Sequence, residues 1–456
     1  MDSTVTAAPV MDGKSEKLPP ASFTALIPFL VFLFFYLGLS IYAKDFYKVP
    51  MPVAFLVASA SAFLLNRKKS LGEKMEIFAK GMGENNIMIM CLIFILAGAF
   101  AATAKAAGAV DATVLISRHF IPDALILPEL FFLACFISLA IGTSCGTIAA
   151  LTPIAAGLIT SMGLSPALAL GAVIGGAMFG DNMSMISDTT IAATRTQNVA
   201  MRDKFIMNLK MILPAALLTS LIYFTAKTPG TIHAALPPLS WKHFLATTPY
   251  LLILAGALTG LNVMLLLFLG TVFAAFFGIC CTPLTFWEAL GNMGKGSLGM
   301  AETLIVAILA GGLLGMIRHN GGIRYLLEKI QYTIKGRYGC ELGIMFLVGL
   351  VNLFTANNTV AIVVAGPVAK DLSDKYGCDP KRISSILDTA SCAIQGLIPY
   401  GAQILIATGI ASGSGIQISS LELIFSLYYP LLLGVALLLS IFLPLFFRKK
   451  AVKNVK

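Results

Sequence analysis

Long apolar stretches separated by short polar segments run along almost the whole chain. The stretch from Ala21 to Ala43 is long enough to cross a bilayer, because about 20 helical residues span the hydrocarbon core. Only 12% of the residues are charged, whereas soluble domains carry about 25%. The sequence therefore predicts an all-α polytopic membrane protein. The apolar runs lie at 22–43, 50–65, 86–108, 124–142, 146–162, 166–180, 205–225, 244–260, 262–281, 299–317, 340–356, 358–373, 383–411 and 420–447.

Some of these runs are too short to cross the membrane alone, notably the pairs that meet near residues 142–147 and 356–360. Their polar tips predict hairpins that enter and leave on the same side. Non-helical backbone at membrane depth is tolerated only where it is buried in protein or lines a wet cavity. Interrupted helices of this kind are typical of secondary transporters.

Composition removes several other classes of protein. The eight cysteines contain no C-x-x-C pair, and the chain has no phosphate-binding loop of the G-x-x-x-x-G-K-[ST] type. The apolar runs lack a histidine-based metal site or a nucleophile–histidine pair, so we expect no cofactor and no catalytic residues. The net charge of +10 is spread over short loops and the tail, which indicates cytoplasmic loops in a lipid bilayer rather than a nucleic-acid partner.

The chain also repeats itself. Residues 81–83, 95–98 and 108 recur at 294–296, 308–311 and 321, an offset of 213 from Gly98 to Gly311. Further on, Pro153 matches Pro367 with an offset of 214, and Gly163 and Pro166 match Gly377 and Pro380 in the same register. This ordered series predicts two structural repeats.

Loop charge indicates that the repeats are inverted. The loop over residues 105–123 is neutral, whereas its counterpart over 318–337 is basic, so positive-inside reasoning places the two on opposite faces. Each repeat is expected to hold a re-entrant hairpin and a broken helix. The predicted segments are a cytoplasmic tail at 1–20, scaffold helices at 21–70, repeat 1 at 71–225, linking scaffold helices at 226–282, repeat 2 at 283–447 and a cytoplasmic tail at 448–456.

The densest polar cluster within apolar sequence spans Asp181 to Thr190. Hard monovalent cations prefer oxygen ligands, which this segment supplies as carboxylates, hydroxyls and an amide. If the segment is helical, Asp181 and Asp188 share one face two turns apart and are the Na⁺ candidates. Asp188 could instead cap a helix that leaves the membrane. The predicted ligands from this segment are Asp181, Asn182, Ser187, Asp188 and Thr189.

Two further elements complete the predicted site. The offset of 214 equates the two hairpin tips, whose candidate ligands are Thr143 and Ser144 in the first half and Asn357, Asn358 and Thr359 in the second. Such residues also join helices by simple hydrogen bonds. The second broken helix contributes Asp388, which could instead be a structural acid, and Gln395, the repeat partner of Asp181.

These motifs resemble the NhaC-type sodium/proton antiporter family of the wider ion-transporter superfamily. The matching residues are 142–147, Gly180 to Ser184 and Ser187 to Thr190. The resemblance implies inverted halves and an elevator-like or related alternating-access cycle, with the ion at Asp181, Ser187, Asp188 and Thr189. Many members carry Lys and Pro where this chain has Asn182 and Met185, and a Glu-Asp-Ser-Gly run where it has Leu387 to Ala390.

Two hypotheses share this scaffold in a multi-pass protein of the cell membrane, which is expected to be a bacterial inner membrane. The first is a Na⁺/H⁺ antiporter whose partners are Na⁺ and H⁺. The second is a Na⁺- or H⁺-coupled transporter of an amino acid or organic anion. An organic anion favours a fixed cation, and neither broken-helix motif has a Lys or Arg before Arg195, which favours the simple ion. A homodimer stays open at this point.

Overall fold

The computed structural model describes residues 20–43, 48–67, 69–226, 237–259 and 261–442, and these residues form helices without any strand. Within them, eight helices are long and apolar enough to cross a membrane. The all-α class and the multi-pass membrane architecture are therefore confirmed. The predicted tails lie outside the described residues, apart from Pro20, and so do residues 227–236 of the linking segment and 443–447 of repeat 2. The segment boundaries stay predictions.

In the first half of the chain, the described residues form thirteen α-helices and two short 3-10 turns: η1 (Phe23–Leu26) leads into α1, and η3 (Asp123–Leu125) leads into α6. Their bounds are α1 (Ile27–Ala43), α2 (Met51–Leu64), α3 (Leu71–Met82), α4 (Asn85–Ala106), α5 (Ala109–Phe120), α6 (Ile126–Ile141), α7 (Ser144–Met162), α8 (Pro166–Met183), α9 (Asp188–Gln197), α10 (Met201–Thr225), α11 (Trp241–Ala246), α12 (Thr248–Leu258) and α13 (Val263–Cys281).

The second half repeats the order of α3 to α8. Its bounds are α14 (Phe286–Gly299), α15 (Ala301–His319), α16 (Gly322–Thr333), α17 (Gly336–Thr355), α18 (Asn358–Tyr376), α19 (Pro380–Gly396), α20 (Ala402–Gly413), α21 (Ser420–Ile424) and α22 (Tyr428–Phe442). The apolar run at 383–411 is thus two helices, because the chain leaves the helical conformation around Pro399.

The helix boundaries recur with the predicted offsets. Glycines at positive φ precede both α5 and α16, namely Gly108 (74°) and Gly321 (84°). Left-handed residues end both α6 and α17, at Gly142 (76°) and Ala356 (46°). Left-handed residues are the usual way to stop a helix and turn the chain sharply, so the two halves build the same hairpin.

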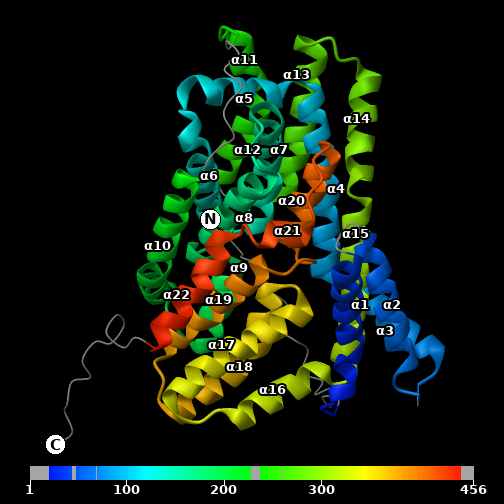
Figure 1. Cartoon of the computed structure of the whole chain (residues 1–456), viewed down its shortest axis with the longest axis vertical. Coiled ribbons are helices and arrows are strands. Elements are labelled where there is room, and N and C mark those ends of the chain that lie inside the picture. Colours follow the sequence, from blue (N-terminus) through cyan, green and yellow to red (C-terminus); the bar gives the residue numbers. More distant parts are fainter. Residues whose placement is uncertain (1–19, 44–47, 68, 227–236, 260, 443–456) are drawn as a thin grey trace, which may run out of the picture.

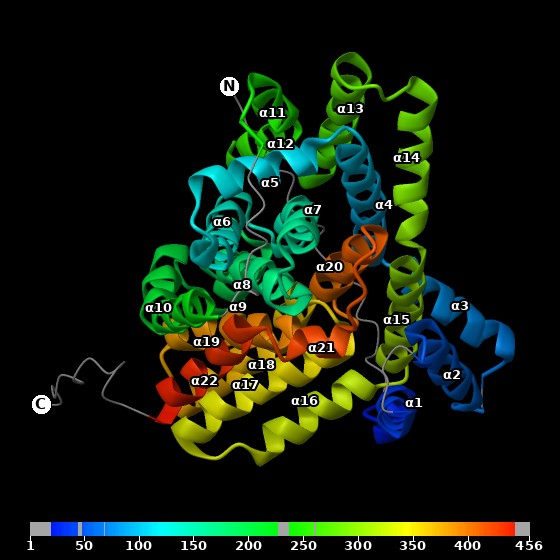
Figure 2. The same ribbon diagram turned by 45° about the horizontal axis from the view of Figure 1, so that its top comes forward.

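The two series also pack on each other reciprocally. In α3, a Cβ added at Gly81 would lie 2.5 Å from the backbone oxygen of Gly311 in α15. In α4, a Cβ added at Gly98 would lie 2.3 Å from the backbone oxygen of Gly296 in α14. The contacts are thus reciprocal: α3 lies against α15, and α4 lies against α14. Figures 1 and 2 show α4 beside α14 along their lengths.

The amphipathic helices α5 and α16 lie at opposite ends of the molecule, α5 near the top and α16 near the bottom of Figure 1. The inverted relation of the two halves and their orientation in the membrane stay predictions. Both helices expose a residue that is suited to labelling, Asp111 in α5 and Lys329 in α16.

We expect an impermeant thiol reagent to label Asp111→Cys from outside the cell and Lys329→Cys only after the membrane is opened. The background carries Cys280→Ser and Cys281→Ser, because both native cysteines are exposed. Position 329 lies in the basic segment 318–337, which the positive-inside rule places on the cytoplasmic face. Labelling of both positions from the same side would contradict the inverted repeat.

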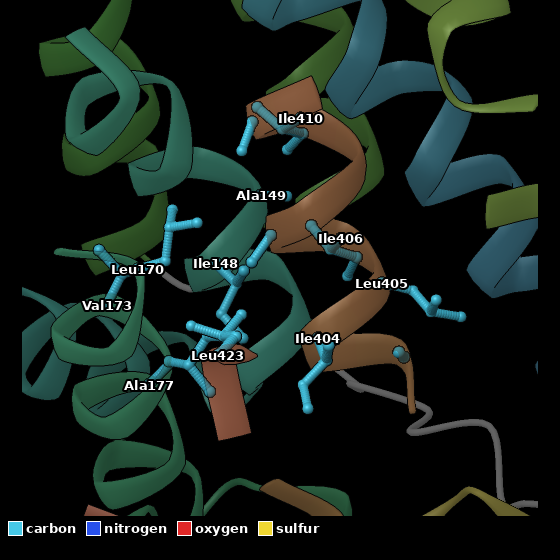
Figure 3. Packing of buried hydrophobic residues seen from close by; sticks show 14 of the residues in the cluster. Ile148, Ala149, Leu170, Val173, Ala177, Ile404, Leu405, Ile406, Ile410 and Leu423 are labelled. Carbon is cyan, nitrogen blue, oxygen red and sulfur yellow. The ribbon is translucent and has the colours of Figure 1, made fainter. Parts of the chain in front are cut away.

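The helices α7, α8 and α20 contribute to the main hydrophobic core next to the breaks. Figure 3 shows Ile148 of α7, Leu170 and Val173 of α8 and Ile406 of α20 in one apolar cluster. All four side chains are fully buried. This packing holds the end of α8 and the start of α7 against the second broken helix.

Small residues let α8 approach α6 closely. A Cβ at Gly176 would lie 2.2 Å from the backbone oxygen of Phe131 and 2.7 Å from the Cβ of Ala134. A Cβ at Gly180 would lie 2.4 Å from the backbone nitrogen of Leu139. Backbone atoms cannot yield as side-chain tips can, so these glycines set the distance between the helices.

We expect Gly176→Ala to lower the free energy of unfolding by about 1–3 kcal/mol, the usual cost of overpacking a filled core. The matched control is Gly434→Ala in α22, where an added Cβ meets no atom within 4 Å. Replacing a mid-helix glycine there should be neutral or slightly stabilising. Thermal unfolding in detergent measures both, and equal effects would contradict the close-packing account.

Candidate functional site

Asp181 lies in the last turn of α8, where the helix ends within the protein interior. The chain leaves the helix at Ser184 and starts α9 at Asp188. The Asp181 side chain is buried, with 5% exposure, and its carboxylate accepts hydrogen bonds from the hydroxyls of Ser144 (2.8 Å) and Ser187 (2.5 Å). The Ser187 hydroxyl also contacts that of Thr189 at 2.9 Å. Oxygen atoms from two segments therefore surround this carboxylate.

The first hairpin tip is shaped to bring Ser144 to Asp181. Gly142 adopts a positive φ of 76°, and a Cβ there would lie 2.8 Å from the Ile186 side chain and 3.1 Å from the backbone nitrogen of Ser187. Glycine thus lets the tip lie directly against the break between α8 and α9. The helix α7 then begins at Ser144, so its first hydroxyl points at the carboxylate.

Two glutamines link this carboxylate to the second hairpin tip. Gln403, which follows the break after α19, donates a hydrogen bond to the Ser144 hydroxyl (3.1 Å). Gln395 donates to the Gln403 side-chain oxygen (2.9 Å) and to the backbone oxygen of Ala356 (3.0 Å) at the second tip. A chain of side-chain hydrogen bonds therefore joins the two tips through the segments on either side of the second helix break.

The second buried acid has a different environment. Asp388, in α19, is 0% exposed and forms an ion pair with Lys204 of α10, which is 1% exposed. The Lys204 ammonium also donates to the backbone oxygen of Asn182 (2.7 Å) and to the Thr190 hydroxyl (2.7 Å). A buried acid and a buried base thus compensate each other's charge.

Amide side chains join the two helices that carry the acids, α8 and α19. The Asn182 side chain donates to the Thr389 hydroxyl (3.4 Å) and accepts from the Asn208 amide (2.9 Å). The Asn208 oxygen in turn accepts from the Ser385 hydroxyl (2.5 Å). Asn182 lies next to Asp181 in α8, so this network fixes the end of α8 against α19.

The remaining predicted residues divide into two groups. At the second tip, Asn357 caps α18 by accepting from the backbone nitrogen of Val360, and Asn358 is buried beside a half-buried Thr359. At the first tip, Thr143 is the half-buried N-cap residue of α7. No hydrogen bond joins any of these four side chains to the Asp181 carboxylate in the described part of the chain.

The expectation that Asp181 and Asp188 share one helix face is wrong. The chain is non-helical from Ser184 to Ser187, so the two acids belong to different helices. Asp188 is exposed and lies in the first turn of α9, where a carboxylate complements the helix dipole. This placement agrees with the capping alternative.

Sequence reasoning missed Lys204 and Gln403. Lys204 follows Arg202 and Asp203, and such a group at the start of an apolar run is typical of a solvated helix end. The signal that could have found it is periodicity: Lys204, Asn208, Met211 and Ala215 are all buried, with the spacing of one helix face. Gln403 follows the break at Pro399, where no periodic pattern indicates which way its side chain points.

The fold and this buried carboxylate define a multi-pass secondary transporter of the cell membrane. The chain belongs to the Na⁺/H⁺ antiporter family, whose family model matches residues 20–227 and 200–442. The family assignment made from the motifs is therefore confirmed, and the family is one of transporters rather than enzymes.

The relatives differ in what they carry. A malate-2H⁺/Na⁺-lactate antiporter of Bacillus subtilis is 23% identical over 87% of this chain and 90% of its own length. The Na⁺/H⁺ antiporter NhaC of Bacillus subtilis is 24% identical over 77% of this chain and 84% of its own. An arginine/ornithine antiporter of Halobacterium salinarum is 22% identical over 70% and 71%.

A solved structure with a similar outline is the Alcanivorax borkumensis YdaH transporter. It matches 84% of this chain and 90% of its own with 16% sequence identity and a TM-score of 0.41.

Proposed function

We propose that this protein exchanges Na⁺ for H⁺ across the membrane and that both ions compete for Asp181. The observation that carries the proposal is the contrast between the two buried acids. Asp388 has Lys204 as its counter-charge, whereas Asp181 has neutral hydrogen-bond donors from Ser144 and Ser187 and no ion pair with Lys, Arg or His among the described residues. A buried carboxylate without a counter-charge is costly in a membrane, so a bound Na⁺ or proton stabilises it.

The surroundings of Asp181 suit a small hard cation. The carboxylate and the hydroxyls of Ser144, Ser187 and Thr189 are oxygen donors, which sodium prefers. The carboxylate lies at the C-terminal end of α8, where the helix dipole favours a positive charge. The mutual exclusion of Na⁺ and H⁺ at one carboxylate is sufficient to couple the two fluxes.

The second candidate is transport of an organic anion or amino acid, and it depends on Lys204. Neither broken-helix motif contains a Lys or Arg, but Lys204 of α10 supplies a fixed positive charge beside both of them. An ammonium has three donors, however, and those of Lys204 are directed at Asn182, Thr190 and Asp388. No donor is left for a substrate carboxylate, which favours the simple cation.

Reconstitution in liposomes with an enclosed pH dye tests the proposal. An inward Na⁺ gradient should drive proton efflux in protein-containing liposomes and not in empty ones. The panel includes Li⁺, K⁺, malate, lactate and arginine, each against choline chloride of equal ionic strength. Proton movement that requires malate, lactate or arginine, and not Na⁺ alone, would contradict Na⁺/H⁺ exchange and support the second candidate.

A further inference from the structure

We infer that the Lys204 ammonium permanently occupies a second cation site, centred on Asp388, and thereby restricts this protein to one bound Na⁺ per chain. The inference rests on the proposed function, because it concerns how many Na⁺ ions the sites at Asp181 and Asp388 hold together. It assigns to Lys204 the role of a built-in cation that sets the ion stoichiometry.

The first support is the chemistry of the groups around the ammonium. Lys204 contacts a backbone oxygen (Asn182), a hydroxyl (Thr190) and a carboxylate (Asp388). These are the hard oxygen donors with which proteins bind metal cations. Asp388 is 0% exposed, and its second carboxylate oxygen has no hydrogen-bond partner among the described residues. The site therefore has ligands in excess of those the ammonium uses.

The second support is the relation between the two acids. Asp181 lies on α8 and Asp388 on α19, which are corresponding helices of the two repeats. Each acid is near a hydroxyl of the segment that follows α8, Ser187 for Asp181 and Thr190 for Asp388 at 3.5 Å. The two carboxylates thus form comparable oxygen-rich sites, and only one of them has a lysine.

The third support is the combined charge of Asp181, Asp388 and Lys204. Asp181 and Asp388 contribute two negative charges and Lys204 one positive charge, which leaves one negative charge in total. One Na⁺ or one proton neutralises it. An uncompensated charge is costly in the hydrocarbon. The protein therefore switches readily between its outward-open and inward-open states only when one cation is bound. Exchange is then one Na⁺ for one H⁺.

The test is the number of ²²Na⁺ ions bound at saturation by purified protein in detergent, measured by equilibrium dialysis. We expect one per chain for the wild type, two for Lys204→Met, and one for the double variant Lys204→Met/Asp388→Asn. The matched control is Lys210→Met, an exposed lysine on the same helix, which should leave the count at one. Size-exclusion profiles identify any variant that fails to fold.

The outcomes separate this inference from the proposed function. Two ions in the wild type, or the same count in folded Lys204→Met as in the wild type, would overturn the inference. If Lys204→Met does not fold, the double variant decides, because a count of zero would mean that Asp388 is a ligand of the transported Na⁺. No binding to the wild type together with one ion in Lys204→Met would refute the proposed function and support the inference.

Discussion

Asp181→Asn is expected to abolish Na⁺-dependent proton movement while the protein still folds and inserts. Asparagine keeps the shape of the side chain but neither releases a proton nor carries a negative charge. In the wild type, the hydroxyls of Ser144 and Ser187 donate hydrogen bonds to the Asp181 carboxylate. A hydroxyl can rotate to accept a hydrogen bond, so both can also bond to the asparagine amide. Proton flux in liposomes under a Na⁺ gradient should fall to that of empty liposomes.

The control for this variant is Asp188→Asn. Asp188 is exposed in the first turn of α9, so its removal costs about 0.3–1 kcal/mol of dipole interaction and should leave exchange active. Full activity in Asp181→Asn would reject Asp181 as the coupling group. If Asp188→Asn were equally inactive, both acids would have to contribute to ion binding.

Lys204→Met in Na⁺-free buffer is expected to lower the free energy of unfolding by about 3–5 kcal/mol, the usual cost of leaving one member of a buried ion pair alone. Lys204 and Asp388 are 1% and 0% exposed, so water cannot screen the remaining carboxylate. The measurement is thermal or denaturant unfolding in detergent, with choline in place of Na⁺.

The double variant Lys204→Met/Asp388→Asn should regain most of that loss, because no uncompensated charge stays buried. Lys204→Met, Asp388→Asn and the double variant form a double-mutant cycle that isolates the interaction energy of the pair. Lys210→Met, an exposed lysine on α10, serves as the surface control. Additive effects of the two single changes would contradict a direct ion pair.

Much of the fold follows from patterns that are visible in the sequence. Apolar runs of bilayer length predict spanning helices, and the offset between Gly108 and Gly321, or Gly142 and Ala356, locates equivalent turns. The same offset equates the two hairpin tips, which Gln395 and Gln403 link through hydrogen bonds from Ala356 to Ser144. These features are readable because backbone geometry restricts which residues can turn or break a helix.

The partners of the two acids could not be predicted in the same way. The pairing of Lys204 with Asp388 joins residues 184 positions apart through the packing of α10 on α19, and no local pattern encodes such a contact. The break from Ser184 to Ser187 also places Asp188 at the start of a separate helix, away from Asp181 in α8. Its position depends on the tip at Gly142, which packs against Ile186 and Ser187, and that contact is again distant in sequence.

If Na⁺ and H⁺ exclude each other at Asp181, binding of Na⁺ must release a proton, and this release can be measured. Purified protein in weakly buffered detergent solution is mixed with NaCl, and the pH change is compared with that caused by choline chloride. The account predicts release of protons by the wild type, falling as the starting pH rises and the carboxylate is already deprotonated, and no release by Asp181→Asn. Na⁺ binding to the wild type without proton release at any starting pH, or equal release by Asp181→Asn, would contradict it.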